Sequence, residues 1–312
     1  MTKEVRIHSL QGYVDAILTC KNELIWDCQK HECMLFRGQC DKEYELLPSI
    51  ARGQRFATSG SLMEEERNLI ESAKYRLPDV FNRSYEPIEL LALLQHYGIP
   101  TRLLDVTENA FVALFFACSE HQEKDAEVII FRHDEKDIAN YPIINAIAES
   151  YKFLKGTISA FGTFLNNAVY QNYFREQYPL FHDLLESCKG TDRYETLNRY
   201  MEDFYQPYYF VLAPNRSTRQ MLQSGRYILF SNAKNAKIDG RGEEPLHYFE
   251  KTIKPMPKDA ACIMERIIIS NDCKESLLNE LSVFGITKGK LFGDSVDTAC
   301  GEIKKNWSRA SH

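Results

Sequence analysis

The sequence predicts one domain of the α+β class, built on a mixed sheet. Short apolar segments typical of strands are separated by helical segments of unequal length, a pattern of α+β and mixed α/β domains. Apolar residues make up 44% of the 312 residues and charged residues 26%, which is enough apolar material for a core. No internal repeat and no linker rich in Ser, Gly or Pro divides the chain, so residues 1–312 are expected to form a single domain with a helical insertion at about 138–205.

Hydrophobic periodicity and capping residues place the elements along the chain. Ser9 is suited to cap a first helix, and Thr107 is suited to cap an apolar helix that runs to Cys118. The insertion is rich in aromatic residues and helix formers and is expected to hold two to four helices. The other expected elements are helices at 61–75, 271–284 and 292–307, and strands or extended segments at 33–36, 101–105, 126–131, 208–212, 226–230 and 262–269.

One helix has both of its ends marked in the sequence. Pro87 suits the first position of a helix, because its backbone is already close to helical geometry. Gly98 favours the left-handed conformation that ends a helix, and Pro100 prevents continuation. The helix is therefore expected to end at His96 or Tyr97.

Charge and hydropathy argue against DNA binding and membrane insertion. The formal net charge is −6, and no basic arm or polybasic tail is present. The longest apolar run, Ala110–Cys118, is nine residues, whereas a membrane span needs about 20. The first residues lack the apolar stretch of a secretory signal. We therefore expect no DNA and no membrane among its partners.

The nine cysteines indicate a reducing compartment. Their number is odd, and no C-x-x-C pair occurs, so reduced thiols in a cytoplasmic protein are expected. Cys28, His31, Cys33 and Cys40 form a loose cluster whose spacing matches no standard zinc pattern. We therefore expect no metal site. The alternative is that these four residues bind a metal ion.

Common catalytic motifs are absent, which leaves three polar clusters at the ends of apolar segments. No phosphate-binding glycine loop, zincin motif or serine nucleophile elbow occurs. The first cluster is Phe36-Arg37-Gly38-Gln39. An Arg at a strand end lets a guanidinium reach a phosphate, and a following Gly lets the backbone pass close to a ligand. The alternative is an Arg that binds a loop carboxylate at the edge of the sheet.

The second cluster spans residues 95–109, between two apolar helices. A helix that starts at Thr107 offers N–H donors and a positive dipole end to an anion. The alternative is a structural network in which Arg102 pairs with Asp105 and Thr107 only caps the helix. The candidate binding residues here are His96, Tyr97, Thr101, Arg102, Asp105, Thr107 and Asn109.

The third cluster is a polar, basic turn at residues 215–227 that enters a strand. Gln223 lies next to the flexible Gly225, where a side-chain amide can bond a ligand hydroxyl. Arg219 is a second candidate binding residue. The alternative is a solvated loop without a ligand.

These motifs resemble the FRG domain family, whose name comes from the triplet found here at Phe36-Arg37-Gly38. The resemblance covers about residues 10–300. It includes the stretch His96–Asp105, the segment Ala113–Ala117 and an Arg-x-x-x-Gln-x-Gly-x-aromatic pattern that begins at Arg219. Val106 departs from the Trp expected at that position.

The order of the three clusters is also similar to the Arg-Ser-Glu branch of the ADP-ribosyltransferases. That resemblance implies a split sheet and NAD as substrate, with Arg37 on the diphosphate and Thr107, beside His96 or Tyr97, at the nicotinamide ribose. It implies that Gln223 bonds a ribose hydroxyl while positive charge develops at the anomeric carbon. Gln223 stands where the branch has Glu, and a neutral amide stabilises that charge less.

The leading hypothesis is an NAD-binding ADP-ribosyltransferase or NAD-cleaving effector, with bacterial stress or phage defence as the expected setting and an unknown acceptor. One alternative is a non-catalytic module that binds a nucleotide or an RNA end through Arg37, Arg102 and Arg219. Another is a protein-binding regulator whose polar clusters are structural. If one dinucleotide is bound, the side chains of Arg37, Thr107 and Gln223 are expected within roughly 10 Å of a shared point in one cleft.

Overall fold

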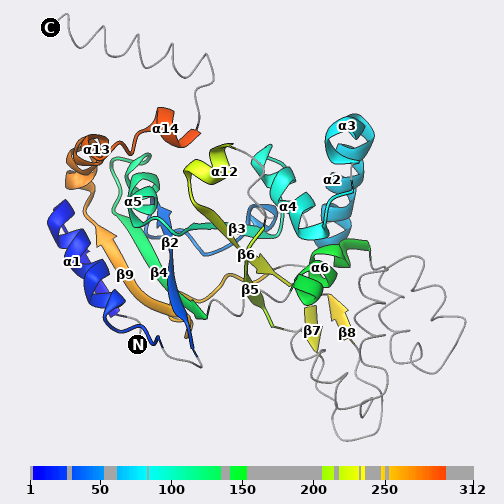
Figure 1. The fold of residues 1–312 in the computed structure, drawn as a ribbon, viewed down its shortest axis with the longest axis horizontal. Helices are drawn as coiled ribbons and strands as arrows, with labels where there is room; N and C mark the ends of the chain where they lie inside the picture. The colour runs from blue at the N-terminus through cyan, green and yellow to red at the C-terminus, as the bar shows by residue number, and fades with distance from the viewer. Residues whose placement is uncertain are drawn as a thin grey trace, which may run out of the picture.

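A seven-stranded mixed sheet forms the centre of the computed structural model (Figure 1). The structure describes residues 3–26, 30–52, 62–82, 84–134, 141–152, 206–213, 218–231, 233–235, 247–249 and 253–292. The α+β class is confirmed. None of the helices in this described part is long and apolar enough to cross a membrane.

The strand order of the main sheet is β1-β9-β4-β2-β3-β6-β5. β1 runs parallel to β9, and the other neighbours are antiparallel. The strands are β1 (Lys3–Ile7), β2 (Glu32–Gln39), β3 (Leu103–Thr107), β4 (Ala126–Asp134), β5 (Tyr208–Val211), β6 (Gly225–Phe230) and β9 (Ile263–Ile269). β7 (Ala233–Asn235) and β8 (His247–Phe249) form a separate pair.

Helices cover the sheet in two groups. Short 3-10 turns lie at Ser49–Ala51, Ser150–Lys152 and Asn271–Cys273. The α-helices are α1 (Leu10–Lys21), α2 (Leu62–Arg76), α3 (Pro78–Phe81), α4 (Pro87–His96), α5 (Ala110–Cys118), α6 (Tyr141–Glu149), α12 (Thr218–Leu222), α13 (Lys274–Val283) and α14 (Lys288–Phe292). Helices α1, α5 and α13 lie beside β9, β4 and β2, and α2, α4 and α6 lie on the side of β3, β6 and β5 (Figure 1).

Each face of the sheet carries an apolar core, because successive residues of the central strand β4 point to opposite faces. Val128 and Ile130 pack with residues of α1, α5 and α13. Ile129 and Phe131 pack with residues of α2, α4 and α6. The near-continuous apolar sequence of β4 is therefore the signature of a strand buried on both sides.

The sheet opens between β2 and β3. β2 pairs with β4 at eight positions, from Glu32 to Gln39, but with β3 only at Phe36, which lies opposite Thr107. The ladder between β2 and β3 does not continue to residues 37–39 of β2. The backbones diverge there, at the Arg-Gly-Gln end of the strand.

The predicted elements are largely present, and the helix caps show one correction. Ser9 caps α1 by accepting a hydrogen bond from the Gly12 amide (3.2 Å). Thr107, however, is the last residue of β3, and Asn109 caps α5. The Asn109 side chain accepts bonds from the amides of Phe111 (2.9 Å) and Val112 (3.3 Å). The expectation that Thr107 caps this helix was wrong, because Asn109 stands directly before the first helical residue.

Several elements were not expected from the sequence. They are β1, α3, α12, α14 and the β7–β8 pair, and α12 lies in the segment that suggested a polar loop. Of the expected insertion, α6 and the 3-10 turn Ser150–Lys152 are described, and residues 153–205 lie outside the described residues. The closing helix expected at 292–307 lies outside them too, except for Phe292.

Gly98 supports a first prediction, on stability. It ends α4 with a φ of 79°, and nothing lies within 4 Å of the position that a Cβ would take. Gly98→Val is expected to lower the free energy of unfolding by about 1 kcal/mol or more, because a β-branched residue is strained at positive φ. Gly98→Asn is the control, because Asn tolerates this conformation and should retain most of the stability. Equal chemical denaturation midpoints for Gly98→Val and the wild type would contradict the cap.

Candidate functional site

A cavity of about 1210 Å³ lies where β2 and β3 diverge, lined by residues of these strands and of β6, α4, α5 and α12. Pockets for small molecules usually have volumes of roughly 300–1,000 Å³, so a dinucleotide has ample room here. Arg37, Thr107 and Gln223, which are 70 and 116 residues apart in sequence, all line this cavity. The other predicted residues in its wall are Gly38, Gln39, His96 and Asp105.

Arg37 presents a charged group to the cavity, and no carboxylate of the described residues forms an ion pair with it. Its Nη1 donates to the main-chain carbonyl of Asp105 (2.6 Å), so the guanidinium occupies the gap where the β2–β3 ladder stops. Its Nε is buried and has no hydrogen-bond partner among the described residues. Burial lowers the pKa of Arg37 to about 10, with Asp105 opposing the shift and Arg52 adding to it. Arg37 therefore stays charged at neutral pH.

Thr107 and Gln223 are held to each other at the second side of the cavity. The Thr107 hydroxyl donates to the main-chain carbonyl of Gln223 (2.6 Å) and accepts from the Asn109 amide (3.0 Å). The Gln223 side chain donates through Nε2 to the carbonyl of Leu291 (3.0 Å). Thr107 thus positions the turn before β6, and the Gln223 Oε1 atom has no bond to the described residues.

Gly38 is required by the packing of α5 against β2. A Cβ at this position would lie 1.9 Å from the carbonyl oxygen of Ala113 and 2.8 Å from the Ala117 amide nitrogen. The close backbone approach that the sequence suggested is therefore made by helix α5. The residue lines the cavity as well, but the helix alone accounts for the glycine.

Gln39 is buried, and its amide holds the loop after β2. Its Nε2 lies 3.3 Å from the carbonyl oxygen of Glu45. With the amide turned by half a rotation, the nitrogen takes the place of the oxygen and donates to the Glu127 carboxylate (2.9 Å) and to the Tyr44 carbonyl (3.2 Å), and this orientation satisfies both amide atoms. Gln39 thus ties the cavity wall to the buried carboxylate of β4.

Arg102 does not line the cavity and does not pair with Asp105. It is fully buried, and its Nε donates to the carboxylate of Glu66 on α2 (2.8 Å). Its two terminal nitrogens donate to four main-chain carbonyls, those of Ile147, Ala148, Phe230 and Ser231. Burial raises the pKa of the Glu66 carboxyl, and Arg102 opposes this shift. The role of Arg102 is to join α2, α6 and β6, and it is out of reach of a ligand.

Three other predicted binding residues, Tyr97, Thr101 and Asn109, are not among the described residues that line the cavity. Tyr97 is 60% exposed and its ring packs edge-on against Phe81. Thr101 is buried, and its hydroxyl donates to the Gln95 side chain (2.5 Å). Asn109 is occupied as a helix cap. Arg219 belongs to α12, and its side chain lies outside the described residues.

Several residues of the wall were not among the ligand-binding candidates predicted from the sequence. Arg52, Tyr44, Cys40 and Glu120 line the cavity from the loops after β2 and α5. A signal existed for Arg52, since it follows the Leu47-Pro48-Ser49 turn. Arg52 is close enough to Arg37 to lower the pKa of the Arg37 guanidinium. Two guanidinium groups in one concave site favour an anionic ligand.

The thiols of the described residues form no disulfide bonds. They belong to Cys20, Cys33, Cys40, Cys118, Cys262 and Cys273. Burial raises the pKa of Cys20 and Cys118 to about 12, so these two stay protonated at neutral pH. Cys28 lies outside the described residues.

Residues 32–126, from the start of β2 to the start of β4, match the family model of the FRG domain. Arg37, His96, Asp105 and Thr107 lie within the match, and Gln223 lies outside it. No curated protein and no solved structure matches the chain.

Proposed function

We propose that this protein binds a dinucleotide such as NAD in the cavity and cleaves or transfers its ADP-ribose group. The supporting observation is the state of Arg37: a charged guanidinium whose buried Nε has no partner among the described residues, in the wall of a cavity of about 1210 Å³. A diphosphate supplies the acceptors that a guanidinium binds best. Arg52 at the same wall adds a second positive charge.

The chemistry requires stabilisation of a positive charge on the ribose. The bond between the ribose C1′ and the pyridinium nitrogen breaks, and its electron pair leaves with neutral nicotinamide. Water or an acceptor then attacks C1′ and loses a proton. In this proposal the Gln223 Oε1 atom accepts a hydrogen bond from a ribose hydroxyl. The Asp105 carboxylate, which also lines the cavity, supplies negative charge opposite the developing positive charge on the ribose.

A non-catalytic nucleotide-binding module is the second candidate, favoured by Gln223. Its amide is neutral, and its Nε2 donor is already bound to the carbonyl of Leu291 (3.0 Å). Such a side chain fixes a ligand hydroxyl better than it stabilises a cation. In this candidate Arg37 and Arg52 hold the phosphates, whereas the buried Arg102 takes no part.

The proposal also includes compartment and setting. We place the protein in the cytoplasm, where thiols stay reduced. The cysteines of the described residues form no disulfide bonds, which supports this proposal. Bacterial stress or phage defence is proposed from the resemblance of the sequence motifs.

Arg37→Ala tests the proposal. The variant is expected to bind NAD or ADP-ribose about 10–100-fold more weakly than the wild type, because a charged hydrogen bond to phosphate contributes about 1.5–3 kcal/mol. Its melting temperature should change little, since the guanidinium makes one hydrogen bond to the described residues. Titration calorimetry with the full chain measures the affinity, and labelled NAD reports released nicotinamide and macromolecule-bound ADP-ribose.

Arg226→Ala is the matched control. Arg226 belongs to β6 close to Gln223, but it pairs with Glu108 (2.6 Å) and does not line the cavity. Its affinity for NAD should equal that of the wild type. Nicotinamide release supports the enzyme, and binding without release supports the non-catalytic module. A wild-type chain that binds no nucleotide, or an Arg37→Ala variant that binds as well as Arg226→Ala, overturns the proposal.

A further inference from the structure

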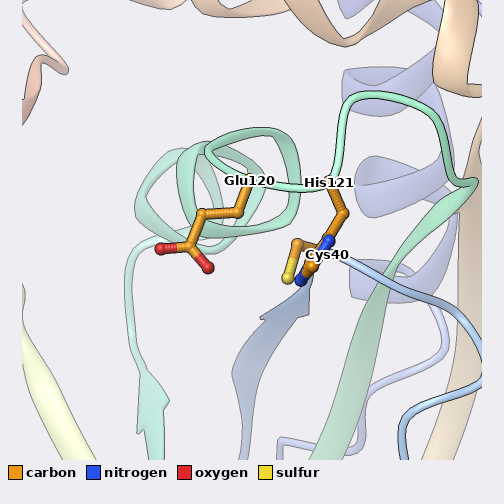
Figure 2. A group of neighbouring side chains, drawn as sticks. All are labelled: Cys40, Glu120 and His121. Carbon is orange, nitrogen blue, oxygen red and sulfur yellow. The ribbon is translucent and has the colours of Figure 1, made fainter.

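Three potential metal ligands meet at the rim of the cavity. The Cys40 sulfur, a Glu120 carboxylate oxygen and a His121 ring nitrogen all lie within 4.8 Å of one another. Cys40 follows the end of β2, and Glu120 and His121 follow the end of α5, with the imidazole beside the thiol (Figure 2). Cys40 and Glu120 also line the cavity. The proposed nucleotide chemistry does not use this group.

A buried lysine holds the backbone of all three residues. Lys274 of α13 is fully buried, and its ammonium donates to three main-chain carbonyls, those of Cys40 (2.8 Å), Glu120 (3.1 Å) and His121 (2.7 Å). One cation from a distant helix therefore joins the two segments that carry the potential ligands. The positions of the three Cα atoms are set by the fold, so an ion would have only the side chains to arrange.

The imidazole of His121 is oriented by a neighbour in the way that metal-binding histidines are. The Tyr44 hydroxyl lies 3.0 Å from Nε2, and the Glu123 carboxylate lies 3.4 Å from Nδ1. A hydrogen bond at one ring nitrogen fixes the ring, and the metal would replace the present partner at the other nitrogen. His121 also has a positive φ of 49°, a backbone conformation that is uncommon for residues other than Gly.

The donor set and its charge select the ion. A thiolate, an imidazole and a carboxylate are the ligands of Zn²⁺, whereas Mg²⁺ and Ca²⁺ take oxygen ligands. The thiolate of Cys40 and the carboxylate of Glu120 together balance the charge of a divalent cation. Metal–ligand bonds of about 2.0–2.3 Å put tetrahedral donors about 3.5 Å apart, so the exposed Glu120 and His121 side chains have to rotate to close the site.

We propose that Cys40, Glu120 and His121 bind one divalent transition-metal ion of the Zn²⁺ type at the wall of the cavity. Three protein ligands leave one tetrahedral position for water or for a ligand oxygen, as in zinc sites that act on substrates. That position faces the cavity, since two of the three ligands line it. Binding exchanges the Cys40 thiol proton for the metal, so affinity falls as the pH is lowered.

Metal titration of the chelator-treated full chain tests this site. Wild-type protein is expected to bind one equivalent of Co²⁺, with a thiolate-to-cobalt absorption band, and Zn²⁺ should displace the Co²⁺. Cys40→Ser, Glu120→Gln and His121→Asn should each lower the affinity at least about tenfold. Asn is chosen at position 121 because it tolerates the positive φ.

Cys33→Ser is the matched control. Cys33 is a half-buried thiol on strand β2, the strand that Cys40 follows, and it lies outside the three-residue group. Its replacement should leave the stoichiometry and the absorption band unchanged. Circular dichroism of the metal-free variants verifies folding. A wild-type spectrum without a thiolate band, or equal affinity in Cys40→Ser and Cys33→Ser, overturns the proposal. No nucleotide is present, so the outcome is separate from that of the NAD experiments.

Discussion

Arg102→Ala is expected to lower the free energy of unfolding by about 3–5 kcal/mol, because it leaves the buried Glu66 carboxylate without its partner. The loss also strips a donor from the four carbonyls that Arg102 joins, on α6 and the end of β6. An unsatisfied buried polar group costs about 1–3 kcal/mol, so the structure around Arg102 is expected to loosen as well. Urea denaturation followed by circular dichroism measures the change.

Arg6→Ala is the control for this experiment. Arg6 pairs with Asp125 at the same kind of distance (3.0 Å), but its side chain is 46% exposed. Exposed pairs contribute about 0–1 kcal/mol, so the denaturation midpoint of Arg6→Ala should stay close to that of the wild type. A double variant, Arg102→Met with Glu66→Leu, removes both charges and should recover much of the stability lost in Arg102→Ala. If Arg102→Ala is as stable as Arg6→Ala, then Arg102 is not buried in solution and returns as a ligand-binding candidate.

Gly38→Ala is the second substitution with a large expected effect. The added methyl would lie 1.9 Å from the Ala113 carbonyl oxygen, so helix α5 has to move away from β2. Overpacking of this kind costs about 1–3 kcal/mol or more, and here the clash is with backbone that cannot rotate aside. The displaced helix also forms the cavity wall at Ala113 and Phe116, so NAD affinity should fall together with the melting temperature.

Gly12→Ala provides a control. Gly12 lies in α1, and its added Cβ meets only ordinary contacts, the nearest at 3.5 Å from the Ser9 Oγ. Gly12 is the third residue of α1, and Ala has a higher helix propensity than Gly by up to about 1 kcal/mol, so this variant should melt at or above the temperature of the wild type. A Gly38→Ala protein with unchanged stability and lost nucleotide affinity would show that the glycine makes room for the ligand and not for α5.

Local signals predicted much of the fold. The helix from Pro87 to His96 was marked by a proline at its start and Gly98 at its end, and both act within a few residues. β4 was equally clear, because a strand buried on both faces is apolar throughout. β1 escaped prediction because it is an edge strand, Lys3–Ile7, with polar residues at most positions. Its pairing with β9 depends on residues more than 250 positions away.

The site was harder to predict, because burial separates residues that look alike in sequence. Arg37 and Arg102 both stand beside apolar strand segments, yet one lines the cavity and the other is enclosed. The difference comes from Glu66, which lies 36 residues before Arg102 and faces it only after α2 packs on the sheet. The sequence likewise suggested that Gly38 makes room for a ligand. The contact that requires the glycine is with Ala113 of α5, 75 residues further along the chain.

The pairing of the strands has a consequence for how this protein can be divided. The FRG match ends at residue 126, whereas β2 pairs with residues 127–134 and β3 pairs with residues 225–229. A fragment cut to the match would retain both strands and lose the long ladder of each. Unpaired strand edges of this kind associate with one another, so such a fragment is expected to aggregate. The matched residues are thus only part of the sheet that has to fold together. Useful truncations have to retain β4, β6 and β9.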